Sequence, residues 1–160
     1  MTLRPMLFAL CAFSGIALMP TQSAAQTRAT RVLTLEGARK AAATGEAEAR
    51  RQGWEMSIAI VDPAGTLLHF IRMDGAPASS VDLSLGKART SARFRRPSKA
   101  LADAVAAGRQ GLVGAEGMLM MEGAVPIVVD GEVVAAIGVS GATGAQDAQV
   151  AAAGAGVVVE

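Results

Sequence analysis

The segment Ile58–Ala76 (IAIVDPAGTLLHFIRMDGA) constrains the fold most, because it holds two apolar β-type runs joined by a turn. The turn, Asp62-Pro63-Ala64-Gly65, opens with Asp and Pro and closes with Gly, the residue chemistry of a tight β-turn. The flanking runs Ser57–Val61 and Thr66–Met73 therefore predict a β-hairpin. Both faces of the second run are largely apolar, so we expect this strand to be covered on both sides.

The remaining elements are predicted from periodicity and turn residues. Apolar spacing predicts helices over 35–52, 81–94, 98–107 and 144–153, and the glycine-rich stretch 108–117 predicts a mobile loop. Strands are expected at 118–121, 127–129 and 133–139, and Asp130-Gly131 between the last two is a strong hairpin signal. Because the strands come in hairpins, the sheet should be antiparallel and the fold class α+β.

The first 25 of the 160 residues predict a secretory signal peptide. Arg4 precedes the apolar run Met6–Met19, and Ser23-Ala24-Ala25 provides a cleavage site after Ala25. The apolar run is too short for a membrane span, so we expect a periplasmic or secreted protein with no membrane association after cleavage. A retained N-terminal anchor is the alternative. After cleavage, we expect the mature chain to have a flexible entry segment at 26–33 and one domain at 34–160.

Composition narrows the function classes. Loss of Arg4 with the signal peptide reduces the 15 Lys and Arg residues to 14, which equals the 14 Asp and Glu residues. A neutral mature chain gives no support for nucleic-acid binding. The single cysteine, Cys11, also lies in the signal peptide, so a disulfide or a cysteine metal site is excluded from the mature chain. The core is rich in Ala, Gly and Val, and we expect it to depend partly on a partner subunit.

His69 is the single imidazole, which excludes a His-pair metal site within one chain. Its functional interpretation is an axial haem ligand or an acid–base group, and its structural interpretation is a polar residue satisfied by a neighbour. Arg72 and Asp74 lie at the end of the same strand. They either form an ion pair that fixes the turn or bind a ligand carboxylate such as a haem propionate. An enzyme acting on a small hydroxy- or keto-acid is the competing hypothesis, with Arg72 holding the carboxylate and Asp74 or Asp62 as general base.

Two further groups of residues stand out. Three methionines, including Met120 and Met121, could line a hydrophobic ligand slot, although Met is more often core filler. The basic cluster is typical of a solvated helix face, with an anion site, a propionate site or a subunit contact as the alternatives. Its members are Lys87, Arg89, Arg93, Arg95, Arg96 and Lys99.

Four segments together resemble the GlcG/HbpS family of small haem- and corrinoid-associated domains. They are Ile58–Ala76, Lys87–Phe94 (KARTSARF), Gly123–Gly131 (GAVPIVVDG) and Ala135–Asp147 (AAIGVSGATGAQD). The resemblance implies a profilin-like fold, with a five-stranded antiparallel sheet between helices on both faces. It also implies homo-oligomers.

The functional content of this resemblance is an exported protein that binds haem or a related tetrapyrrole or corrinoid, in haem or redox sensing with a sensor protein partner. The candidate contacts are then His69 as the metal ligand, with Arg72, Asp74, Met120 and Met121 around the cofactor. Two departures from the family pattern, Ala124 in Gly123–Pro126 and Ala135 in Ala135–Gly138, each add a methyl group beside a backbone-lined surface.

Overall fold

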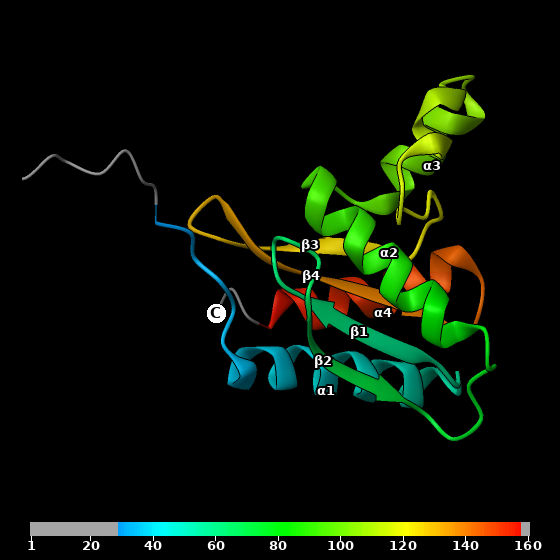
Figure 1. Cartoon of the computed structure of the whole chain (residues 1–160). Coiled ribbons are helices and arrows are strands. Elements are labelled where there is room, and N and C mark those ends of the chain that lie inside the picture. Colours follow the sequence, from blue (N-terminus) through cyan, green and yellow to red (C-terminus); the bar gives the residue numbers. More distant parts are fainter. Residues whose placement is uncertain (1–28, 158–160) are drawn as a thin grey trace, which may run out of the picture.

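The computed structural model describes residues 29–157, which form a four-stranded sheet with helices on both faces (Figure 1). The predicted signal peptide, residues 1–25, lies outside the described residues. Within the described part of the chain, no helix is both long and apolar enough to cross a bilayer. The elements in order are α1 (Leu35–Gln52), β1 (Ser57–Val61), β2 (Leu67–Arg72), α2 (Ser80–Phe94), α3 (Ser98–Ala106), the 3-10 helix η1 (Gln110–Gly114), β3 (Ala124–Val129), β4 (Glu132–Ser140) and α4 (Gly144–Gly156).

All neighbouring strands are antiparallel, in the order β2-β1-β4-β3, as the hairpins predicted. The turn between β1 and β2 is closed by Asp62, whose Oδ1 accepts hydrogen bonds from the amides of Ala64 and Thr66. The turn between β3 and β4 places Asp130 and Gly131 at φ angles of 52° and 77°, the positive values that a type I′ turn requires.

The helix ends follow from local chemistry. Thr34 caps α1 through a hydrogen bond from the amide of Gly37, and Gly53 ends the helix in the left-handed conformation. Thr143 and Gln146 form a capping box at the start of α4. All three features depend on residues within one turn of the helix end.

One face of the sheet packs against α1 and α4, while α2 crosses the other face (Figure 1). The first core is the larger, and it includes Ile58, Ile60 and Ile137 from the sheet. The second is built on small side chains such as Ala59 and Ala136. On the α2 face, these small residues let the helix approach the backbone of the sheet closely.

Gly138 shows how close this approach is. A Cβ atom at this position would lie 2.3 Å from the carbonyl oxygen of Ser84 and 2.5 Å from the amide nitrogen of Ala88. Both atoms belong to the backbone of α2, so neither can move without shifting the helix. The Ser57 and Ser80 hydroxyls, 2.7 Å apart, form a hydrogen bond in the same buried layer. The sequence thus brings α2 onto β4 through the absence of a side chain.

The expectation of a five-stranded sheet is wrong, because the sheet has four strands. The segment 118–121, predicted to be a strand, is bound to α2 instead of the sheet. The amide of Leu119 donates to Thr90 Oγ1 at 2.7 Å, and the Leu119 side chain packs over Gly86. The short apolar run predicts a strand, whereas the Leu119 amide bonds a helix side chain and the amide of Met121 bonds the carbonyl of Leu119.

Two segments depart from the compact layers. α3 and η1 stand clear of the sheet (Figure 1), and of the α3 apolar side chains Leu101 is the one that is buried. The stretch 108–117, predicted to be a loop, contains the short helix η1.

The end of the entry segment runs along the β3–β4 hairpin, where the amide of Leu33 donates to Val134 O and Arg31 pairs with Asp130.

We predict that Gly138→Ala lowers the free energy of unfolding by more than about 3 kcal/mol, because the new methyl group meets helix backbone. Urea denaturation of purified protein measures the change. Gly156→Ala is the matched control, since a Cβ there meets nothing within 4 Å, and its stability should be equal to or above that of the parent. Equal stabilities for the two variants would contradict the close helix–sheet contact.

Candidate functional site

His69 lies on β2, the outermost strand at one edge of the sheet, with its side chain on the face covered by α1 and α4. The ring is half-buried. Among the described residues its nitrogens form no hydrogen bond, and no buried side-chain nitrogen or oxygen lacks a partner. Both ring nitrogens therefore reach solvent. The imidazole of His69 is therefore held on a strand and keeps its nitrogen atoms available to bind an external ligand.

Arg72 and Asp74 do not form the ion pair considered from the sequence, as far as the described residues show. Arg72 donates to the carbonyl oxygen of Ala76 at 3.0 Å and braces the turn after β2. Asp74 is exposed beside it. Asp62, the alternative base, is used by its own turn. The acid–base arrangement of the enzyme hypothesis is thus not assembled at this end of the sheet.

The structure separates His69 from the two methionines. Met120 and Met121 follow Leu119, whose contacts place this segment beside α2, on the opposite side of the sheet from His69. Met120 is half-buried and Met121 is 44% exposed. One flat ligand bound at His69 therefore cannot also contact both methionines of the same chain.

Metal-binding groups of three or more His, Cys, Asp or Glu side chains are absent from residues 29–157. Two of the cavities on the described surface illustrate what the fold offers a ligand. One, of about 80 Å³, is walled by residues 29–31, Arg95 and 131–133. The other, of about 370 Å³, lies open along residues 108–112. Neither of these two includes His69, which lies instead on the edge strand β2.

Sequence reasoning missed a buried ion pair between Lys87 and Asp147. Lys87 Nζ donates to Asp147 Oδ2 at 2.7 Å and to Val139 O at 3.1 Å, and both side chains are 2% exposed. Asp147 Oδ1 accepts from the amide of Ala142. Gly123 makes the passage possible, because a Cβ there would lie 2.8 Å from Nζ. The pair joins α2 to α4 past the start of β3.

Burial raises the pKa of the Asp147 carboxyl above its ordinary value, while the hydrogen bond and charge of Lys87 lower it again. The ionised form of Asp147 is therefore stabilised in the interior by the neighbouring Lys87 ammonium group. Removal of either would leave an uncompensated charge in the interior, which is far more costly than the pair itself.

The basic cluster predicted at α2 is not one surface. Lys87 is buried in the pair, and the side chains of Arg89 and Arg93 donate to the carbonyl oxygens of Gly65 and Ala64 in the β1–β2 turn. Lys99 pairs with Asp103 on α3. Arg95, at the end of α2, faces the small cavity. Helical spacing alone could not divide these residues, because their partners come from distant segments.

Comparison with known proteins identifies the family. The family model described as haem degrading protein HbpS-like matches residues 33–156. The chain belongs to the HbpS-like family. Protein GlcG of Escherichia coli K12 is 43% identical over 109 residues, which cover 68% of this chain and 81% of GlcG.

Solved structures agree with this assignment. The HbpS-like chain matches a double mutant of Streptomyces reticuli HbpS at a TM-score of 0.80 and 34% identity, covering 98% of this chain and 100% of the other. It also matches PduOC, solved as a complex with haem, at a TM-score of 0.73 and 21% identity, covering 81% of this chain and 96% of that one. The second likeness concerns the fold alone.

Three of the segments that carry the HbpS-like resemblance meet at the buried pair. Lys87 begins the first of them, Gly123 begins the second, and the third supplies both Val139 and Asp147. The signal that could have found the pair was therefore present, as a lysine and an aspartate in separate motifs. No local rule connects residues 60 positions apart.

We predict that Lys87→Met lowers the free energy of unfolding by about 3–5 kcal/mol near neutral pH, because the Asp147 carboxylate is left buried alone. The loss should be smaller near pH 4. Without Lys87, the folded-state pKa of Asp147 rises further above its ordinary value of 3.8. The folded state then binds the proton more tightly than the unfolded state, so stability falls as pH rises through that window. Urea denaturation at both pH values measures this.

The double variant Lys87→Met/Asp147→Leu is the control, and it should recover most of the lost stability because both charges are removed together. An equal loss for Lys87→Met at both pH values would show that the carboxylate is not the cause.

Proposed function

We propose that this protein is an exported haem-binding protein in which His69 ligates the iron. The observation that carries the proposal is the half-buried imidazole on an edge strand, whose nitrogens bond no other described residue. The HbpS-like family supports haem as the tetrapyrrole, and the likeness in fold to PduOC, solved with haem, supports it further.

The surroundings of His69 fit a flat apolar cofactor bound against the edge of the sheet. Leu67, two residues away on the same strand, is 45% exposed and offers apolar surface at that edge. Leu68 and Ile71 pack into the core beneath the strand and hold its position. Neutral imidazole is a common axial ligand of haem iron, and the chain supplies one here.

Arg72 is the proposed partner of a propionate group. It lies three residues beyond His69, roughly 10 Å along the strand and on its opposite face, so its side chain would reach a propionate around the open edge of β2. Its guanidinium holds the Ala76 carbonyl with one nitrogen, which leaves other donors free for a carboxylate. Asp74 would limit this attraction through its negative charge. The methionines Met120 and Met121 belong to a separate surface of the same chain.

Export and assembly are part of the proposal. The apolar segment before Ala25 directs secretion, the mature chain begins at Gln26, and the protein acts in the periplasm or outside the cell. The small-residue core is consistent with a homo-oligomer, and a sensor protein is the partner expected for a haem-sensing role. Mass spectrometry of the protein recovered from the periplasm or medium should give a chain starting at Gln26. A full-length chain held in the membrane fraction would contradict export.

We predict that haemin added to the purified mature protein gives a saturable shift of the Soret band, because the His69 nitrogen binds the iron. His69→Ala should lose the spectrum of the imidazole complex and bind haemin at least about tenfold more weakly, the loss of one axial bond. Free imidazole added to His69→Ala should restore the spectrum.

Met121→Leu is the matched control, since this side chain lies on the other side of the sheet, and its titration should equal that of the parent. Arg72→Gln should weaken haemin binding without changing the shape of the spectrum. An unchanged spectrum in His69→Ala would remove His69 as the ligand, and no Soret shift in the parent protein would overturn the proposed function.

A further inference from the structure

The cavity of about 80 Å³ at the end of α2 has the chemistry of a second, separate binding site. Its walls come from three parts of the chain, namely residues 29–31, Arg95 at the end of α2, and Gly131–Val133 in the β3–β4 hairpin. Because a single water needs roughly 10–15 Å³ of such space, the cavity holds on the order of five to eight non-hydrogen atoms. A tetrapyrrole is many times larger, so the haem proposal does not use this space.

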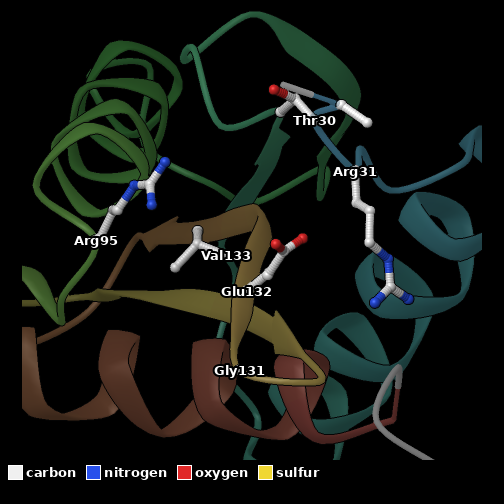
Figure 2. Close-up of a pocket in the computed structure, with 7 residues that line it drawn as sticks. Thr30, Arg31, Arg95, Gly131, Glu132 and Val133 are labelled. Carbon is white, nitrogen blue, oxygen red and sulfur yellow. The ribbon is translucent and has the colours of Figure 1, made fainter. Parts of the chain in front are cut away.

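Three charged side chains line the cavity, and two of them lie on opposite sides of an apolar one. Figure 2 shows the Arg95 guanidinium on one side of Val133 and the Glu132 carboxylate on the other, with Thr30 above them. Arg31 is already held by Asp130 at 2.7 Å, and that carboxylate raises the pKa of Arg31. Within the described residues, the Arg95 guanidinium forms neither a hydrogen bond nor an ion pair. The cavity therefore has the Arg95 cation on one side of Val133 and, on the other, the Glu132 carboxylate, which lies on the side of Arg31.

The backbone of Arg95 is a second observation that points to this site. Arg95 ends α2 in the left-handed conformation, with φ 53° and ψ 40°. Helix ends of this kind ordinarily use glycine, because a long side chain is disfavoured at positive φ. Asp130 is the other non-glycine residue with positive φ in the described chain, and its turn type explains it. No turn rule asks for arginine at position 95, and a strained residue at a cavity often marks a functional site.

We propose that this cavity binds a small amino acid as a zwitterion. The carboxylate group of the ligand would accept hydrogen bonds from Arg95, and its ammonium group would donate to Glu132. The carbon atoms between them would rest on Val133, and the Thr30 hydroxyl completes the polar rim. A simple anion would satisfy Arg95 but would be repelled by Glu132, whereas a zwitterion matches both charges. This proposal is independent of haem binding.

The expected affinity is low. Arg95, Glu132 and Arg31 are exposed, and ion pairs in contact with solvent are weak, so we expect a Kd on the order of 1–10 mM for L-alanine. Titration of the ¹⁵N-labelled protein with L-alanine, followed by amide chemical shifts, should move the signals of Thr30, Arg95 and Glu132 to a common saturation point. Acetate, which lacks the ammonium group, and L-alanine methyl ester, which lacks the carboxylate, should each bind more weakly.

Arg95→Gln and Arg96→Gln form a matched pair, because both remove one exposed charge at the end of α2. Arg95→Gln should raise the Kd for L-alanine at least about fivefold, while Arg96→Gln leaves it unchanged. Glu132→Gln should reduce the preference for L-alanine over acetate. Equal Kd values in the two arginine variants, or no common saturation point at concentrations on the order of 50 mM, would overturn the proposal.

Arg95→Gly separates binding from folding. Glycine suits the left-handed position, so the melting temperature should equal or exceed that of the parent while L-alanine binding is lost. A lower melting temperature together with unchanged binding would show that Arg95 serves the helix end and not a ligand.

Discussion

The ion pair between Lys87 and Asp147 is the interaction on which the rest of the structure depends. It joins the helix on one face of the sheet to a helix on the other, and it passes the start of β3 beside Gly123. A buried pair gains little net stability against its desolvation, but it penalises any arrangement that leaves one charge alone. We infer that its role is specification. It fixes α2, α4, the start of β3 and the end of β4 relative to one another, and the close contact of α2 with Gly138 follows from that placement.

Elements set by local chemistry were predictable from the sequence, and those set by distant partners were not. The span of α1, the hairpin turn at Asp130-Gly131 and the capping box of Thr143 rest on a few neighbouring residues. The fifth strand was predicted at 118–121 because its residues are apolar, but Thr90 Oγ1 and Gly86 bind that segment to α2. The resemblance of four segments to the family identified the family correctly, but the five strands that it implied are one more than the sheet has.

In the candidate site too, the features set by neighbouring residues were predictable and those set by distant residues were not. The sequence placed His69 on a strand and showed it to be the single imidazole, which was enough to select it. It could not show that the register directs His69 and the segment of Met120 to opposite sides of the sheet, or that Arg72 braces its own turn. Arg95 was one of six basic residues between positions 87 and 99, and nothing in the sequence distinguished it from the others. What distinguishes it is a backbone angle and a cavity formed with residues more than 30 positions away, and neither is visible in a helical pattern.

The fold thus presents two separate surfaces, the edge of β2 with His69 and the small polar cavity beside Arg95. We propose that haem binds at that edge strand. The most direct measurement is paramagnetic broadening of ¹⁵N amide signals on adding ferric haemin to the mature protein. The account predicts that broadening is greatest at Leu68, His69 and Phe70 and weak at Met120 and Met121. Broadening centred on 118–121, or spread evenly over the chain, would contradict it.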